Sequence, residues 1–439
     1  MTPGVRTRLL ASMDVGRLVV LCGAGLSMAP PSSLPSARQV AEMCFDAYQA
    51  RVDPQIDPSL RQDLEALAEH FASLNTLKAQ FIENLVPWNK FERPPNPGHA
   101  AIADFLITKA AVAGLSSNYD TLIERRAWEY GADFRGSLNG DEATAWSHSQ
   151  APLIKFHGCS NRDRDSTVWA PTQLADPIIS DRIEKSRVWM EANLRQKDLL
   201  VVGFWTDWDY LNQIIGGALQ GIDPLSITVI DLSGDADLEQ KAPDLWALAH
   251  RSHVTFSHIQ ESGAEALDDL RKGFSENYIR QVLAAGRAAL EELTGVACDP
   301  ALLNVAEMDN ESLYDWRRDA EGVPNGRPAT AKRPSDGDAL GCFHLLLRRA
   351  GAAQLSQGYM LHGSSIRVIN GALCVLSSIA ARFIEAPAAS SADFFVAVGA
   401  TDLGLPANVV RSGTPGSVMR PAAGGKWLTF EQAKTELGI

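Results

Sequence analysis

Short runs of apolar and β-branched residues recur along the first 260 residues, and segments with helical apolar spacing lie between them. Continuous apolar runs of this length are typical of parallel strands that are buried on both faces of a sheet. Strands that alternate with helices form a doubly wound α/β sheet. The sequence therefore predicts six such strands, at 18–22, 112–115, 153–156, 199–202, 227–232 and 254–257.

The connection between the first and second predicted strands is unusually long. It spans about 90 residues, far more than the crossover connections that are typical of such folds. Helical apolar spacing recurs within it, and a proline-rich break follows at 87–97. We therefore expect residues 37–100 to form a helical insertion that caps one side of a ligand cleft.

The pattern changes after the last predicted strand. A helix is predicted over 263–292, and residues 322–338 have the glycine and proline content of an exposed linker. A helix at 340–350 and strand-like alternation near 359–369 and 394–398 follow. We expect a large domain over 1–290, a helix and linker over 291–338, and a smaller α+β domain over 339–439 that serves assembly or partner binding.

Charge is distributed unevenly along the chain. The chain has a net charge of −13, yet residues 300–439 carry 13 basic and 13 acidic residues, so the acidic excess lies in the first part. Such a field repels phosphate backbones and disfavours direct binding of nucleic acid by the large domain. The sequence has neither a long apolar run nor a signal-peptide pattern, so we expect a cytoplasmic protein without a membrane segment.

The six cysteines are scattered and form no Cys-x-x-Cys pair. Neither a disulfide framework nor a four-cysteine zinc site is predicted, and no metal is expected.

A glycine-rich turn is the strongest local motif. The strand predicted at 18–22 runs directly into Gly23-Ala24-Gly25-Leu26-Ser27. Glycines at this turn allow close approach of a pyrophosphate, and exposed amides at the start of the next helix bind its negative charge. A purely structural turn from strand to helix has the same pattern, so the neighbouring motifs must decide between these interpretations.

Polar side chains also follow the second and third predicted strands. Asn118 and Asp120 come directly after the second, and His157 and Gly158 follow the third. The carboxyl ends of parallel strands are where open α/β sheets bind ligands. Asn118 or Asp120 can also cap a helix that begins near Thr121, and a single histidine is often structural. The cap and the ligand role are compatible.

In this order the three motifs resemble those of the sirtuin family, and Val201-Val-Gly203-Phe204 and residues 227–231 match its later strands. The resemblance covers residues 10–285 and implies a Rossmann-like fold of the sirtuin type that binds NAD⁺. It assigns Gly23, Ala24, Gly25, Ser27, Gly203 and Phe204 to NAD⁺ binding, mostly at the phosphates, and Asp231 to the adenosine ribose. It assigns Asn118 and Asp120 to the nicotinamide ribose or a nearby water, and His157 to the role of catalytic base.

The departures from the family pattern concern the acceptor of the reaction. The paired cysteines of deacylating sirtuins are missing, and residues 28–37 lack the family's acid and arginine. The sequence of residues 117–124 instead resembles that of the bacterial sirtuin-like NADases of antiphage defence. That resemblance implies an NAD⁺ glycohydrolase that acts in abortive infection, with water as the acceptor, oriented by Asn118 or Asp120 and deprotonated through His157.

The same resemblance implies that a partner or an assembly event controls the activity. The partners it suggests are a separately encoded HerA-type ATPase, a short Argonaute or a nucleotide-sensing enzyme, and it implies a homo-oligomer. Two alternatives remain open at this point. One is a zinc-free NAD-dependent protein-lysine deacylase, and the other is a catalytically silent nucleotide sensor or scaffold.

Overall fold

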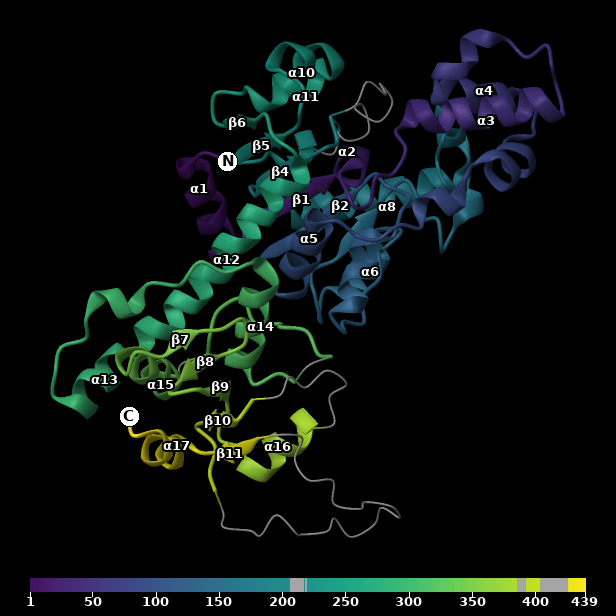
Figure 1. The fold of residues 1–439 in the computed structure, drawn as a ribbon. Coiled ribbons are helices and arrows are strands. Elements are labelled where there is room, and N and C mark those ends of the chain that lie inside the picture. The colour runs from purple at the N-terminus through teal and green to yellow at the C-terminus, as the bar shows by residue number, and fades with distance from the viewer. Residues whose placement is uncertain (206–216, 218, 325, 336, 385–391, 403–424) are drawn as a thin grey trace, which may run out of the picture. The chain divides into compact units, whose positions relative to one another are not determined.

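The computed structural model describes residues 1–205, 217, 219–324, 326–335, 337–384, 392–402 and 425–439. These residues form two compact units, drawn in Figure 1. Unit 1 comprises residues 1–129 and 133–270, and unit 2 comprises residues 130–132 and 271–439.

A six-stranded parallel sheet forms the centre of unit 1. Its order is β3-β2-β1-β4-β5-β6, and every neighbouring pair is parallel. This is the doubly wound sheet that the apolar runs predicted, and each predicted strand overlaps an observed one. The strands are β1 (Leu18–Cys22), β2 (Ala111–Ser116), β3 (Leu153–Lys155), β4 (Asp198–Val202), β5 (Ser226–Ile230) and β6 (Thr255–Ile259).

The register of the sheet brings the ends of three strands together. Cys22, the last residue of β1, pairs with Ser116 of β2 and with Val202 of β4. The loops that follow these strands therefore begin side by side at one edge. The strand order reverses between β1 and β4, which is the point where doubly wound sheets form a ligand crevice.

Helices flank the sheet, as the segments between the strands predicted. Apolar side chains of β1, β4 and β5 are buried, because helices cover the sheet. These helices of unit 1 are α1 (Pro3–Asp14), α2 (Ala24–Met28), α5 (Pro97–Ile107), α6 (Leu122–Glu129), α7 (Gly140–Trp146), α8 (Pro177–Asn193), α10 (Asp235–Lys241), α11 (Pro243–Ala249) and the first part of α12 (Gly263–Ala285). None of the helices within the described ranges is long and apolar enough to cross a membrane.

The expected insertion between β1 and β2 is helical. A capping box of Ser36 and Gln39 begins its first helix, and α3 and α4 pack side by side (Figure 1). Aromatic and aliphatic residues give the insertion a core of its own, which also includes Trp169 from the segment after β3. Its elements are α3 (Ala37–Arg51), η1 (Pro58–Gln62), α4 (Leu64–Ser73), the π-helix η2 (Leu77–Leu85) and η3 (Trp88–Phe91).

Unit 2 is the smaller α+β domain that the sequence predicted. Its sheet has the order β11-β10-β9-β8-β7, with β9, β10 and β11 parallel and β7, β8 and β9 antiparallel. Its strands are β7 (Ala353–Gln354), β8 (Tyr359–Leu361), β9 (Ser364–Asn370), β10 (Phe394–Val398) and β11 (Lys426–Leu428). Its helices are α13 (Arg287–Thr294), α14 (Asn310–Glu321), α15 (Asp338–Arg349), α16 (Leu376–Ile384) and α17 (Phe430–Leu437).

The division between the units falls earlier than expected, at Leu270 instead of 290. The second half of α12 supplies Tyr278 and Val282 to the core of unit 2, so the helix is shared. Residues 291–338 contain α14, whose buried face includes Trp316, and Ala329 beyond it is fully buried. The composition of 322–338 suggested an exposed linker, but Ala329 is buried and its amide donates to the hydroxyl of Tyr314 at 3.2 Å, so this part of the segment packs within unit 2.

Candidate active site

The glycine turn after β1 packs tightly against the turn after β4. The amide of Gly23 donates to the carbonyl of Val202 at 3.1 Å, and that of Gly25 donates to the carbonyl of Gly203 at 2.9 Å. A Cβ added to Gly25 would lie 2.8 Å from the Cα of Gly203, so a side chain does not fit there. These glycines therefore allow the close packing of the two turns, and Ala24 and Gly25 are exposed at the surface of the turn.

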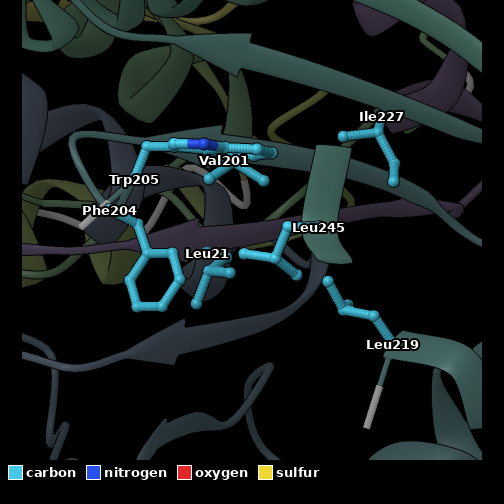
Figure 2. A pocket seen from close by; sticks show the side chains of 7 residues that line it. All are labelled: Leu21, Val201, Phe204, Trp205, Leu219, Ile227 and Leu245. Atoms are coloured by element: carbon cyan, nitrogen blue, oxygen red, sulfur yellow. The ribbon is translucent and has the colours of Figure 1, made fainter. Parts of the chain in front are cut away.

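The two residues predicted after β4 differ in their surroundings. Gly203 adopts a positive φ of 56° at the turn itself, a conformation that favours glycine. The side chain of Phe204 is only 3% exposed and belongs to the core of unit 1. It lines a small apolar cavity of about 10 Å³, shown in Figure 2, whose other lining residues are Leu21, Val201, Trp205, Leu219, Ile227 and Leu245.

A buried group of four polar side chains joins the glycine turn to the loop after β2. The hydroxyl of Ser27 donates to Oδ2 of Asp120 at 2.9 Å and lies 3.1 Å from Nε2 of His99. The side-chain amide of Asn118 donates to the same hydroxyl at 3.2 Å. We refer to Ser27, His99, Asn118 and Asp120 as the Ser27 cluster. It ties α2, α5 and the loop after β2 together at the carboxyl edge of the sheet.

The carboxamide of Asn118 has one fixed orientation. Its nitrogen Nδ2 donates to the carbonyl of Gly23 at 3.1 Å as well as to the Ser27 hydroxyl. A carbonyl only accepts, so the nitrogen and not the oxygen must face Gly23. Both amide hydrogens are then used, and Oδ1 is the acceptor of this side chain that remains.

Asp120 holds the loop in two ways. Its Oδ1 accepts from the amide of Leu122 at 3.1 Å, so the predicted cap of the following helix is confirmed. Its carbonyl accepts from the ammonium of Lys155, which also pairs with Glu124 at 3.2 Å in the interior. Burial lowers the pKa of Lys155, but the combined effect of Glu124, Cys159 and Asp120 outweighs burial and raises that pKa overall. Lys155 therefore stays charged and anchors the loop.

His157 lies at the end of β3 but is enclosed. Its side chain is 1% exposed, and its ring lies 4.6 Å from that of Phe156 and 6.4 Å from that of Tyr119, measured between centroids. Burial, and then the positive charge of Arg182, lower the pKa of His157 to about 3. The imidazole is therefore neutral at physiological pH.

Tyr119 connects this enclosure to the helical insertion. Its ring stacks on Trp169 at 4.3 Å, and Trp169 meets Phe81 and Trp88 of the insertion edge-on at 5.6 and 5.8 Å. We refer to this group of four aromatic residues as the aromatic bridge. Polar contacts reinforce it on the outside, where Lys78 pairs with Asp165 at 2.9 Å and the hydroxyl of Thr172 donates to Glu69 at 2.9 Å.

Comparison with known proteins finds a family match within unit 1. Residues 113–247 match the SIR2-like domain family. This SIR2-like region includes Asn118, Asp120, His157, Gly203 and Asp231 but begins after the glycine turn. A search among curated proteins finds no match.

Solved structures of Sir2 homologues are similar to this chain at low identity. A mutant Sir2 homologue in complex with ADP-ribose is 17% identical with a TM-score of 0.34, over 63% of this chain and 98% of that chain. A Sir2 homologue in complex with NAD is 17% identical with a TM-score of 0.31, over 60% of this chain and 91% of that chain.

Asp231 lies where the sequence placed it, directly after β5 in the SIR2-like region. Its Oδ1 accepts from the amide of Ser233 at 2.8 Å, and the side chain is half-buried. Within the described part of the chain, no group of three or more His, Cys, Asp or Glu side chains is arranged to hold a metal ion.

The sequence interpretation missed His99. This residue contacts Ser27 from 72 positions further along the chain, which no local motif indicates. The available signal was the start of α5, where Asn96 and Pro97 begin a helix and His99 occupies the third helical position of a capping box. That pattern predicts a buried helix start, and the contact with Ser27 follows only from packing.

Proposed function

We propose that unit 1 binds NAD⁺ and hydrolyses the bond between nicotinamide and ribose, which gives nicotinamide and ADP-ribose. The observation that carries this proposal is the fixed carboxamide of Asn118, whose Oδ1 is left to accept at the carboxyl end of β2. The exposed turn at Ala24 and Gly25 adjoins it, where the strand order reverses. The SIR2-like match over 113–247 also supports an NAD-related activity.

The residues at this edge suit the parts of NAD⁺. Ala24 and Gly25 offer exposed backbone without bulky side chains, which fits a pyrophosphate. Asp231 uses one carboxylate oxygen for Ser233, and its Oδ2 is suited to accept from a hydroxyl of the adenosine ribose. Phe204 contributes to the core and not to ligand contact, so we assign no binding role to its ring.

The reaction requires a positioned water and a proton acceptor. In the proposed step, Oδ1 of Asn118 accepts a hydrogen bond from the water. The water oxygen then bonds to the carbon of the nicotinamide ribose that carried nicotinamide. Nicotinamide leaves with the electron pair of the broken bond, and the water proton passes to the neutral imidazole of His157. Ser27 already uses its hydroxyl within its cluster and so acts in positioning.

The enclosed state of His157 suggests how the activity is controlled. An imidazole whose pKa is about 3 is a weak base at neutral pH, and exposure to water would return that pKa toward 6.5. The aromatic bridge keeps Tyr119 over this region by contacts with the insertion. We propose that displacement of the insertion activates the site.

The proposed trigger is a separately encoded protein or homo-oligomerisation, within a bacterial antiphage abortive-infection system. A HerA-type ATPase, a short Argonaute and a nucleotide-sensing enzyme are the partner classes that the resemblance suggests. The physical support is that unregulated NAD⁺ cleavage would kill the host cell, and the site has a built-in enclosure that such an event can open.

The test is incubation of the purified full chain with NAD⁺ alone, with nicotinamide and ADP-ribose quantified by chromatography. Because the site is enclosed until it is triggered, we expect slow release of both products in equal amounts without any acylated peptide, and loss of this basal activity in Asn118→Ala. Asn193→Ala, which changes an amide at the exposed end of α8, is the matched control and should keep full activity.

Two outcomes would overturn the proposal. Cleavage that depends strictly on an acylated peptide would indicate a deacylase. Binding of NAD⁺ without cleavage, in both the unmodified chain and a Lys78→Ala variant with a weakened insertion contact, would indicate a sensor or scaffold.

A further inference from the structure

The backbone fixes which nitrogen of His99 carries hydrogen. His99 occupies the third position of α5, and its Nδ1 lies 3.1 Å from the backbone amide nitrogen of Asn96. A backbone amide always donates, so Nδ1 must be the acceptor and cannot carry a hydrogen. The side chain of Asn96 in turn accepts from the backbone amide of His99 at 3.2 Å, so the two residues form a reciprocal capping box.

The ring is also neutral, so its single hydrogen is on Nε2. His99 is 1% exposed, and burial lowers its pKa to about 4 although the negative charge of Asp120 acts in the opposite direction. Nε2 lies 3.1 Å from the hydroxyl oxygen of Ser27. His99 therefore donates to Ser27, and no rotation of the ring is needed to make this bond.

This donation completes the hydrogen bonding of the Ser27 hydroxyl. Its oxygen has two lone pairs, which accept from His99 and from the amide of Asn118, and its one hydrogen goes to Asp120. With every position filled, the hydroxyl cannot rotate. The direction of the Asn118 carboxamide, and with it of Oδ1, then depends on His99 as well as on the Gly23 carbonyl.

We propose that His99 is a positioning residue of this site, whose Nε2 hydrogen fixes the Ser27 hydroxyl and thereby the acceptor oxygen of Asn118. The inference rests on the proposed function, because it gives His99 a part in orienting the attacking water. His99 does not itself touch the reacting atoms.

Two conservative variants separate this role from that of a helix cap. Asparagine places its amide oxygen near the position of Nδ1, so His99→Asn keeps the acceptor for the Asn96 amide and loses the donor to Ser27. Glutamine places its amide nitrogen near the position of Nε2, so His99→Gln keeps the donor and loses the acceptor. The surface residue His148, changed to Asn, is the control.

We expect kcat for NAD⁺ hydrolysis to fall about tenfold in His99→Asn, with KM changed by less than about twofold. His99→Gln should keep kcat within about threefold of the unmodified chain, although its melting temperature should be lower because the cap is lost. An unchanged kcat in His99→Asn, or a larger loss of kcat in His99→Gln, would contradict the proposal.

A spectroscopic measurement tests the same bond without relying on turnover. In ¹⁵N-histidine NMR spectra of the full chain near neutral pH, His99 should be the neutral tautomer with hydrogen on Nε2. A positively charged ring, or hydrogen on Nδ1, would overturn the inference even if NAD⁺ is cleaved. The Nε2 tautomer in a chain that does not cleave NAD⁺ would overturn the role in positioning together with the proposed function, while leaving the bond to Ser27 established.

Discussion

Two buried histidines, one in each unit, make the same kind of hydrogen bond in different surroundings. In unit 2, Nε2 of His344 lies 3.5 Å from the indole nitrogen of Trp316, which can only donate. The hydrogen of this neutral ring is therefore on Nδ1, which lies 2.9 Å from the hydroxyl of Tyr359. His99 donates to Ser27 in the same way through its other nitrogen.

The two hydroxyl groups differ in their other hydrogen-bond partners. The hydroxyl of Tyr359 also accepts a hydrogen bond from Nε of Arg348 at 3.3 Å, and Tyr359 lies in the apolar core of unit 2. The hydroxyl of Ser27 donates to Asp120 and accepts from Asn118 at the edge of the sheet, beside an exposed turn. A buried pair of histidine and hydroxyl is therefore not in itself a sign of function. Its position at the carboxyl ends of the strands makes the Ser27 cluster a candidate site, whereas the His344 pair stabilises a core.

Acid should destabilise both histidine–hydroxyl pairs, and we expect this loss of folding stability to be the largest of the effects. Burial lowers the pKa of His99 to about 4 and those of His157 and His344 to about 3, so between about pH 6.5 and 4 the unfolded chain binds protons that the folded chain does not. Stability should therefore fall as the pH drops from 6.5 toward 4. We expect a loss of about 2 kcal/mol per histidine by about pH 5. Urea denaturation across this range measures it, and a stability independent of pH would contradict the neutral state of these buried rings.

Asn118→Ala should disturb the Ser27 cluster and leave the His344 pair intact. Loss of the oriented acceptor should reduce NAD⁺ hydrolysis by about 100-fold. The free energy of unfolding should also fall, by about 1–3 kcal/mol, because the side chain is only 9% exposed and its loss leaves the Gly23 carbonyl and the Ser27 hydroxyl each without one partner. Steady-state kinetics and a melting curve on the same preparation measure both. A loss of activity no larger than the loss of folded protein at the assay temperature would identify Asn118 as structural.

Three members of the Ser27 cluster come from segments that follow predicted strands, and the fourth does not. Asn118, Asp120 and Ser27 were predictable, because parallel strands end at one edge and their loops must meet there. His99 was not, because it reaches Ser27 only through packing of α5 on α2, where a Cβ on Gly98 would lie 2.6 Å from Leu26.

The burial of two other predicted residues, His157 and Phe204, also depends on tertiary packing. His157 follows its strand as expected, but Tyr119 and the segment carrying Trp169 enclose it, which no local pattern records. Phe204 follows β4 as expected, yet its ring packs into the core. The six strands were predictable from apolar runs alone. The division at Leu270 was not, because one continuous helix serves both cores.

Unlike Asn118→Ala, His344→Leu should reduce folding stability without reducing activity. The substitution leaves the indole of Trp316 and the hydroxyl of Tyr359 each without one buried partner. We expect a loss of about 1–3 kcal/mol in the free energy of unfolding. NAD⁺ hydrolysis per folded molecule should be unchanged, and reduced activity in fully folded protein would show that unit 2 influences the site. His148→Leu on the surface is the control.

Lys78→Ala should have the smallest effect, and it should be a gain. The pair with Asp165 is exposed, so its loss should change the stability little. Because the pair supports the contact that encloses His157, we expect NAD⁺ hydrolysis to rise about two- to threefold. Arg38→Ala, which removes another exposed ion pair of the insertion, is the control. A fall in activity would contradict the proposed role of the enclosure.

The most direct test of the difference between the two clusters is a titration of the ¹⁵N-histidine-labelled full chain with NAD⁺, followed by NMR. The account predicts that the ring signals of His99 shift as NAD⁺ binds while those of His344 stay in place. A shift of His344 alone, or no shift of His99 at saturating NAD⁺, would contradict it.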